Sequence, residues 1–347
     1  MLSNPVFCIS RRASSTRPLL AGLALAVCVA AAPASAQSPT PIDAAASSTR
    51  LILLGTGAGP IPRRDRSQPA NLLVVGGRPY LIDAGNGVAR QLAFAGYATA
   101  DVRTIFITHH HIDHNADIGA LMSFTWIEDN KRNRADVPPV RFYGPPGTSE
   151  LVAAAQSFLS VSERIFRAEV PMRPSAGLFE AHDFARDGEV YRDDRVVVTA
   201  AENTHYQFAP GSPSAGRDKS YALRFDTPGR SVVFTGDTGP SEALERLAGG
   251  ADVLVSEVMD LDASMKAIES KAALPAPVAA AVRRHMAQEH LTPEQVGLLA
   301  QKAHVKLVVL THFSPGLDGE TDMSRYVDGV RKHYTGVVIA GRDLMEL

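Results

Sequence analysis

Residues 108 to 117, with the sequence THHHIDHNAD, hold four histidines and two aspartates within ten positions. Neutral imidazole nitrogens and carboxylate oxygens are ligand atoms for zinc, and manganese and iron accept them too. His109 and His111 follow an apolar run that reads as a strand, so a tight loop would aim both at one point, and Asp113 and His114 would turn toward a second point nearby. The alternative is a solvated histidine patch, which the His-x-His-x-Asp-His spacing disfavours.

Histidines and aspartates recur just past three later predicted strands, as His205, Asp237 and His312. Taken singly, each of them is more readily explained as a turn cap. Together and in order, they predict that two sheets deliver ligands to one metal site. Asp83, in a glycine turn after an earlier strand, is expected to accept hydrogen bonds from ligand imidazoles. His110 breaks the alternation of the loop and is expected to point elsewhere.

These residues and several short motifs resemble the metallo-β-lactamase superfamily and, within it, the ribonuclease Z and arylsulfatase-like branch. The matching stretches are Leu54-Gly-Thr-Gly57, Phe142-Tyr-Gly-Pro-Pro-Gly147, Phe234-Thr-Gly-Asp237 and Glu289-His290-Leu-Thr292. The resemblance spans roughly residues 50 to 340. It implies an α/β fold, an αβ/βα four-layer sandwich, with the metals at one end of the two sheets.

The resemblance also implies how seven ligands would be shared between two metal ions, expected to be zinc, with manganese or iron as alternatives. His109, His111 and His205 would hold the first ion, and Asp113, His114 and His312 would hold the second. Asp237 would bridge the two ions.

Such a site suits ester hydrolysis, because two divalent ions roughly 3.5–4 Å apart hold a bridging hydroxide and stabilise the charge on the attacked centre. Asp113 would bind a metal and orient the nucleophile. His290, just ahead of a helix cap, is the candidate acid for the leaving group. In ribonuclease Z relatives this histidine works with a glutamate from a His-Glu-Ala-Thr segment, and Glu257 matches it here although its neighbours differ. The alternatives are a surface histidine and a solvated strand-end acid.

Short apolar runs alternate with helical stretches from residue 50 onward, which predicts one α/β hydrolase domain over residues 50–347. The expected strands are 50–54, 71–75, 79–82, 104–108, 140–143, 195–201, 220–225, 231–235, 253–256, 306–311 and 337–339. The expected helices are 88–96, 116–128, 148–158, 242–248, 278–289, 293–303 and 323–333.

The N-terminal residues predict export. Residues 1–36 resemble a secretory signal, with three arginines, an apolar run and Ala34-Ser35-Ala36. Cleavage after Ala36 would leave no membrane anchor and would remove both cysteines, Cys8 and Cys28. Residues 37–49 are polar and contain proline, and are predicted to form a flexible tether. The expected location is periplasmic or secreted.

Charge and location together set the expected partner. The formal charge of −2, made more negative by loss of the three arginines, gives no general attraction to nucleic acid. Ribonuclease Z processes transfer RNA precursors in the cytosol, which does not fit an exported chain. A small-molecule ester is therefore the expected partner, nucleic acid is not expected, and a homo-oligomer is left open.

The sequence thus predicts an exported dinuclear hydrolase of phosphodiester or sulfate ester bonds. One alternative is a lactone or β-lactam hydrolase of the same fold, in which a histidine acid is less needed. Another is a non-catalytic metal-binding protein, against which the complete ligand set argues. No Gly-x-Ser-x-Gly motif is present to support serine catalysis.

Overall fold

The computed structural model describes residues 48–133, 136–270 and 273–347. The predicted signal peptide, residues 1–36, lies outside the described residues. Residues 37–47 of the predicted tether lie outside them as well. None of the described helices is both long enough and apolar enough to cross a membrane.

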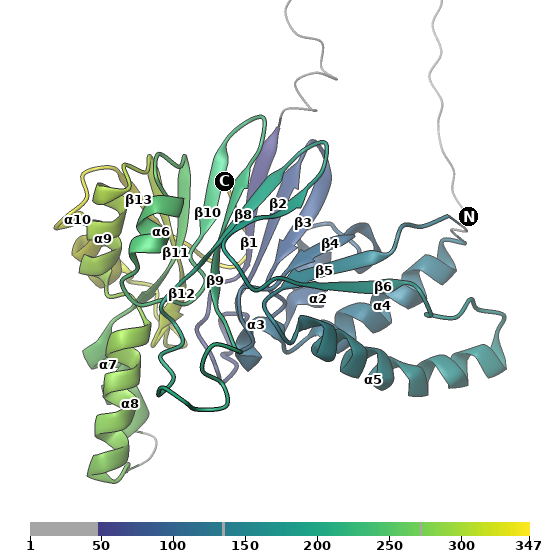
Figure 1. The fold of residues 1–347 in the computed structure, drawn as a ribbon, viewed down its shortest axis with the longest axis horizontal. Coiled ribbons are helices and arrows are strands. Elements are labelled where there is room, and N and C mark those ends of the chain that lie inside the picture. Colours follow the sequence, from purple (N-terminus) through teal and green to yellow (C-terminus); the bar gives the residue numbers. More distant parts are fainter. Residues whose placement is uncertain (1–47, 134–135, 271–272) are drawn as a thin grey trace, which may run out of the picture. The chain divides into compact units, whose positions relative to one another are not determined.

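Two seven-stranded sheets form the centre of the described part (Figure 1). The first sheet has the order β14-β1-β2-β3-β4-β5-β6, and the second has the order β13-β12-β11-β10-β9-β8-β7. The strands of the first are β1 (Thr49–Gly55), β2 (Ala70–Val75), β3 (Arg78–Ile82), β4 (Thr104–Phe106), β5 (Val140–Gly144), β6 (Phe179–Asp183) and β14 (Met345–Glu346). The strands of the second are β7 (Gly188–Arg192), β8 (Val197–Glu202), β9 (Tyr221–Asp226), β10 (Ser231–Phe234), β11 (Val253–Met259), β12 (Leu307–Ser314) and β13 (Val337–Ala340).

Each sheet has an antiparallel part and a parallel part. Strands β1 to β3 and β7 to β10 pair antiparallel, whereas β3 to β6 and β10 to β13 pair parallel. Parallel strands covered on both faces need apolar side chains on both faces. Strand β11 fits this rule, because all seven of its residues are buried, and Glu257 is its one charged residue.

Helices cover the outer face of each sheet (Figure 1). Beside the first sheet lie α2 (Val88–Phe94), a 3-10 turn (Thr99–Asp101), α3 (Ile112–Asn115), α4 (Ile118–Lys131) and α5 (Thr148–Glu169). Between the strands β10 to β13 of the second sheet come α6 (Glu242–Leu247), α7 (Leu261–Glu269), α8 (Ala276–Glu289), α9 (Pro293–Lys302) and α10 (Ser324–Arg331). Helices α7 and α8 project beyond the strand ends (Figure 1, lower left).

Three apolar clusters separate four layers. One lies between the first sheet and its helices and includes Leu81 and Leu92. A second joins the second sheet to α9 and α10, and a third fills the space between the sheets. In the third, the rings of Phe106 and Phe225 meet edge to face with centroids 5.0 Å apart. The predicted αβ/βα four-layer sandwich is therefore confirmed.

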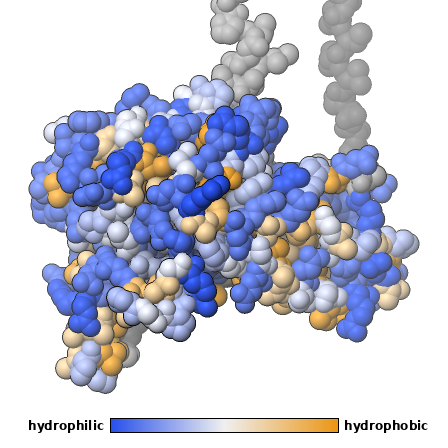
Figure 2. Space-filling model, viewed as in Figure 1, coloured by the Kyte–Doolittle hydropathy of each residue, from blue (hydrophilic) through white to orange (hydrophobic). Residues whose placement is uncertain are grey.

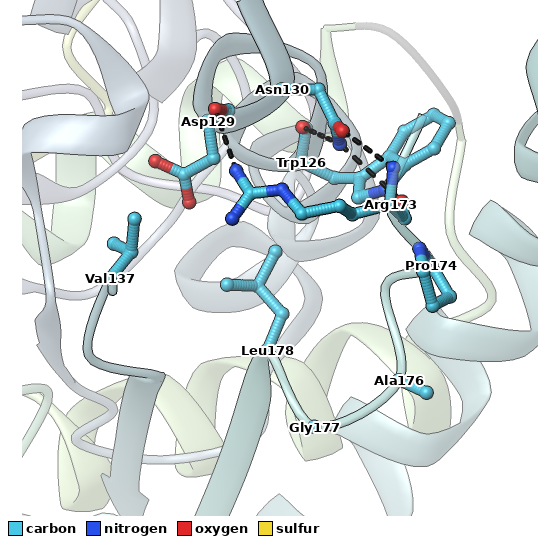
Figure 3. A pocket seen from close by; sticks show the side chains of 9 residues that line it. All are labelled: Trp126, Asp129, Asn130, Val137, Arg173, Pro174, Ala176, Gly177 and Leu178. Atoms are coloured by element: carbon cyan, nitrogen blue, oxygen red, sulfur yellow. Dashed lines mark hydrogen bonds between the residues drawn. The ribbon is translucent and has the colours of Figure 1, made fainter. Parts of the chain in front are cut away.

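Trp126 secures α4 at a place away from the ligand residues. It is buried, and its Nε1 donates a hydrogen bond of 2.8 Å to the carbonyl of Arg173 in the loop before β6. Asn130 holds the same loop by accepting from the Arg173 N–H, so the side chains in Figure 3 fix the loop to the helix. Trp126 is thus a packing residue.

Candidate active site

The predicted ligand loop forms the connection between β4 and α4. His111 is the N-cap of the single-turn helix α3, and Asp113 and His114 lie inside that turn. A helical turn between His111 and Asp113 changes the direction of successive side chains, so the loop presents two sets of ligands instead of one. His110 points elsewhere, as expected, with its Nε2 3.3 Å from the carbonyl of Pro145.

Two clusters of potential ligand atoms result. In the first, nitrogens of His109, His111 and His205 all lie within 4.8 Å of one another, and His205 Nε2 is 2.9 Å from His111 Nδ1. In the second, atoms of Asp113, His114, Asp237 and His312 lie within the same limit. The seven residues that the sequence singled out are brought together from four segments: the β4–α4 connection, the loops after β8 and β10, and the end of β12.

Asp237 lies between the two clusters. Its Oδ2 is 3.1 Å from His312 Nε2 in the second cluster, and 3.9 Å from both His109 Nε2 and His205 Nε2 in the first. Its Oδ1 is 3.3 Å from His114 Nε2. One carboxylate therefore reaches ligand atoms of both groups, as a bridge requires.

The donor set fits a divalent metal. Nε2 of His109 and of His114 are enclosed and have no hydrogen-bond partner among the described residues. An unsatisfied buried polar group costs about 1–3 kcal/mol, so an enclosed cluster of them suits a cation. Metal ligation also needs neutral imidazoles. Burial lowers the pKa of His109 well below its usual value and that of His205 to about 3, which keeps both neutral. In the second cluster burial also opposes charge, but the Asp237 carboxylate and its neighbours outweigh it and raise the pKa of His114 and of His312, so a cation there would have to displace their protons.

Hydrogen bonds to the remaining ring nitrogens orient the imidazoles. Asp83, in left-handed backbone conformation with φ 63°, accepts from His114 Nδ1 at 2.9 Å and from the Thr108 N–H at 2.8 Å. His205 Nδ1 is 2.9 Å from the carbonyl of Glu289. The expectation that Asp83 holds a ligand imidazole is confirmed, and such bonds turn Nε2 toward the metal position.

Glu257 and His290 form a buried pair beside the clusters. Glu257 Oε2 accepts from His290 Nδ1 at 2.7 Å, and Glu257 Oε1 accepts from the Thr238 N–H at 2.6 Å. The side chains are only 1% and 14% exposed, so a solvated acid and a surface histidine are both excluded. Burial opposes charge on His290, but the Glu257 carboxylate outweighs it, and the pKa of His290 lies above its usual value. Burial raises the pKa of Glu257.

Gly59 is a site residue that the sequence did not reveal. Its N–H donates to Asp113 Oδ2 at 2.9 Å, and a Cβ on Gly59 would lie 2.2 Å from that oxygen. A glycine is therefore needed for the backbone to approach the carboxylate. The two glycines after β1, Gly57 and Gly59, are the only signal that the sequence offers for this approach.

Tyr206 and His285 were also missed. The Tyr206 ring stacks on His205 with centroids 5.3 Å apart, and its hydroxyl accepts from the His110 N–H at 3.2 Å. The His285 ring lies 6.2 Å from that of His290, in the last turns of α8. The sequence gave one hint for Tyr206, which is that it directly follows the candidate ligand His205.

Comparisons with known proteins agree with this geometry. A family model described as "Beta-lactamase superfamily domain" matches residues 78–313. The chain is 32% identical over 299 residues to ribonuclease Z of Mycobacterium avium (strain 104), covering 84% of this chain and 95% of that protein. Ribonuclease Z of Mycobacterium marinum is 30% identical over 295 residues, with the same coverage. The chain belongs to the metallo-β-lactamase superfamily, in its ribonuclease Z branch.

Solved structures show the same fold. The metallo-β-lactamase fold protein YhfI from Bacillus subtilis aligns with a TM-score of 0.60 at 16% identity, over 86% of this chain and 98% of that one. The short form of human tRNase Z aligns with a TM-score of 0.55 at 20% identity, over the same shares. As a member of this superfamily with its candidate ligand residues brought together, the protein is a metal-dependent hydrolase.

Two predictions are wrong. The relatives are ribonucleases by name, so the expectation that nucleic acid is not a partner is overturned. The expectation of a periplasmic or secreted location is overturned by the same relatives, since ribonuclease Z works in the cytosol. The first error came from a formal charge summed over the whole chain, which does not describe the field at one cleft. The second rested on residues 1–36, outside the described part.

Proposed function

We propose that this protein hydrolyses phosphodiester bonds in RNA with two metal ions and a histidine acid. The observation that carries the proposal is the Glu257–His290 pair, 2.7 Å apart and buried beside a ligand set that is complete without it. A buried pair of this kind has no task in a protein that only binds metal.

The proposed ligands of the first ion are His109, His111 and His205, and those of the second are Asp113, His114 and His312. Asp237 is the proposed bridge between the two ions. Two divalent ions, which we propose to be zinc, would activate water and stabilise the charge that builds on the attacked phosphorus. Manganese and iron are the alternatives that the same ligands accept.

Asp113 and His290 are the proposed catalytic residues, and Glu257 positions His290. The Gly59 N–H fixes Asp113 Oδ2, so that the carboxylate has one orientation toward the attacking water. Because His290 gives its Nδ1 hydrogen to Glu257, its Nε2 is free to donate a proton to the leaving oxygen. The Glu257 carboxylate stabilises the charged imidazole before that transfer.

RNA fits this acid better than the other substrates considered. The ribose oxygen that leaves when an RNA phosphodiester is cleaved is a poor leaving group without a proton. Lactone and β-lactam opening depends less on such help. The ribonuclease Z relatives, which match over 84% of this chain, support the same substrate class.

The test is a panel of substrates given to zinc-reconstituted protein: a 3′-extended transfer RNA precursor, an aryl sulfate, a lactone and a β-lactam. We expect cleavage of the RNA, and loss of that cleavage in His290→Ala but not in the exposed-histidine control His333→Ala. Lactone or β-lactam turnover without RNA cleavage would replace the proposal with the alternative hydrolase.

A further inference from the structure

Three aromatic rings lead from the first ligand cluster to the protein surface. The Tyr206 ring stacks on the ring of His205, and the Phe208 ring lies against Tyr206 with centroids 5.1 Å apart. Tyr206 also meets the rings of His109 and His111 edge to face, with centroids 5.8 and 5.2 Å apart. Tyr206 is therefore seated on the ligand cluster, and Phe208 is carried on Tyr206.

The Phe208 ring is partly open to solvent, with an exposed fraction of 39%. Four other phenylalanines are exposed among the described residues, and they lie on α2, α4 and α5, beside the first sheet: Phe94, Phe124, Phe158 and Phe166. In Figure 2, orange surface gathers at the lower right, over α5. Phe208 differs from these four because it packs on a ring that touches the candidate ligands.

The segment that carries Tyr206 and Phe208 is held in place. Residues 206–219 belong to the connection from β8 to β9, which lies below the strand ends in Figure 1. Gln207, between the two rings, donates from Nε2 to the carbonyl of Gln288 in α8 at 3.0 Å. Hydrogen-bonded turns follow, in which the Ser212 N–H donates to the carbonyl of Ala209 and the Ala215 N–H to that of Ser212. A surface that is already ordered loses less entropy when a ligand binds.

A flat, partly exposed ring beside a hydrolytic site suits a flat partner. Proteins hold unpaired nucleobases by stacking them on aromatic side chains, and every base has a face that can stack. Residues 206–219 also carry two cations, Arg217 and Lys219, against one carboxylate, Asp218. An excess of positive charge suits the phosphate backbone to which such a base is attached.

We propose that Phe208, supported by Tyr206, stacks an unpaired nucleobase of the RNA beside the phosphodiester that is cleaved. The proposal rests on the phosphodiesterase function proposed above. Only the Tyr206 ring separates Phe208 from His205, so the stacked base belongs to a nucleotide that adjoins the cleaved bond. Because stacking does not read the edge of a base, the site requires a base at this nucleotide and tolerates all four.

The test uses zinc-reconstituted protein and a short single-stranded RNA whose cleaved bond has been mapped. In two further substrates an abasic ribose replaces the nucleotide on one side or on the other side of that bond. Stacking on an aromatic side chain is worth roughly 5- to 150-fold per base. We therefore expect kcat/KM to fall by such a factor when the stacked base is removed, and the affected substrate identifies the nucleotide. Exchange of that base for another should change kcat/KM much less.

Three variants assign the effect to the Phe208 ring. Phe208→Leu keeps an apolar side chain but removes the aromatic face, so the advantage of the complete RNA over the abasic RNA should nearly disappear. Phe208→Trp provides another aromatic face and should keep the advantage. Phe94→Leu makes the same change as the first variant at an exposed position of α2, and should show the advantage of the parent protein.

Fluorescence of 2-aminopurine measures stacking without turnover. The fluorophore replaces the stacked base in an RNA whose cleaved bond is a non-hydrolysable phosphonate, and stacking quenches its emission. We expect quenching when this RNA binds the parent protein or Phe208→Trp, and none when it binds Phe208→Leu. A purely structural role of Phe208 would not produce this division.

The outcomes separate the two proposals. RNA cleavage with the same advantage of the complete RNA in Phe208→Leu as in the parent protein overturns the stacking site and leaves the phosphodiesterase function standing. Quenching that depends on Phe208, without cleavage of RNA, overturns the phosphodiesterase function alone. Equal losses of turnover on the complete and abasic RNAs in Phe208→Leu would mean that Phe208 only supports Tyr206 and His205, and would also overturn the stacking site.

Discussion

The ligand-bearing strand ends and the α7–α8 projection are held in opposite ways. Asp83, His109 and Asp237 are at most 3% exposed. Backbone N–H groups of Thr108 and Thr238 donate hydrogen bonds to the carboxylates of Asp83 and Glu257 and fix their positions. Helix α8 has no buried residue. The groups proposed for chemistry are therefore set by the core, whereas α8 is held mainly at its C-terminal end, where the carbonyl of Glu289 lies 2.9 Å from His205 Nδ1. Substitutions in the two regions should have different effects on metal content.

Asp237→Ala should have the largest effect. Its carboxylate approaches histidines of both clusters, so we expect a loss of bound metal together with a loss of turnover greater than about 100-fold. Loss of a mere hydrogen-bond partner of a ligand already costs 10–100-fold. Elemental analysis and a diester assay measure the two effects. Asp328→Ala, at an exposed position, is the control. Full metal content and activity in Asp237→Ala would make Asp237 a turn residue.

His290→Ala should leave metal content unchanged and lower turnover of esters with poor leaving groups by about 10²–10⁴-fold. Turnover of nitrophenyl esters should fall much less, because nitrophenoxide leaves without receiving a proton. Glu257→Gln is expected to lower turnover of esters with poor leaving groups more than that of nitrophenyl esters, as His290→Ala does. The loss of turnover should be smaller, because this change weakens only the orientation of His290.

His290 also lies in a cluster with His205 and Asp237 whose atoms could hold a metal. Loss of metal in His290→Ala would therefore assign it as a ligand. Equal losses on both classes of ester would assign it to substrate positioning.

Gly59→Ala should have the next largest effect on turnover. The added Cβ would overlap Asp113 Oδ2, so the carboxylate must move. We expect turnover to fall about 10- to 100-fold, with a melting temperature close to that of the parent protein. Asp113→Asn, which keeps the shape but removes the charge, provides the comparison. Unchanged turnover in Gly59→Ala would show that the position of Asp113 is not critical.

The sequence predicted which histidines and aspartates the fold brings together, and the reason is physical. His109, His111, Asp113 and His114 lie within six positions, so their arrangement is set by one local turn. Gly59 and Asp113 are 54 positions apart, and their contact depends on how two loops pack. Local spacing carries the first kind of information and not the second.

The missed elements follow the same division. Strands β6 and β7 lie at the sheet edges and carry charged residues, with sequences FEAHD and GEVYR and no continuous apolar run. Helix α7 has nine residues, of which two are buried. Sequence alone therefore indicated the cluster of histidines and aspartates, but not that α7 and α8 lie side by side next to it.

The smallest expected effect is on stability and lies outside both regions. Burial opposes ionisation of Asp193, but hydrogen bonds from Tyr80, from the N–H groups of Arg195 and Val196, and from Tyr191 outweigh it and lower its pKa to about 2. Tyr80 belongs to the first sheet and Tyr191 to the second, so this carboxylate joins the two sheets. A lowered pKa stabilises the folded state above the unfolded value of about 3.9, and this contribution disappears as the pH falls through about 2.

Asp193→Asn should therefore destabilise the metal-free protein by about 1 kcal/mol at pH 7, after allowance for solvent screening. At pH 3 the difference from the parent should fall to roughly half, because the parent has then lost part of the contribution. Urea unfolding at both pH values measures it. Metal content should be unchanged, because Asp193 belongs to neither cluster of potential ligands. A difference that stays constant with pH would mean that the asparagine disturbs packing and that charge is not the cause.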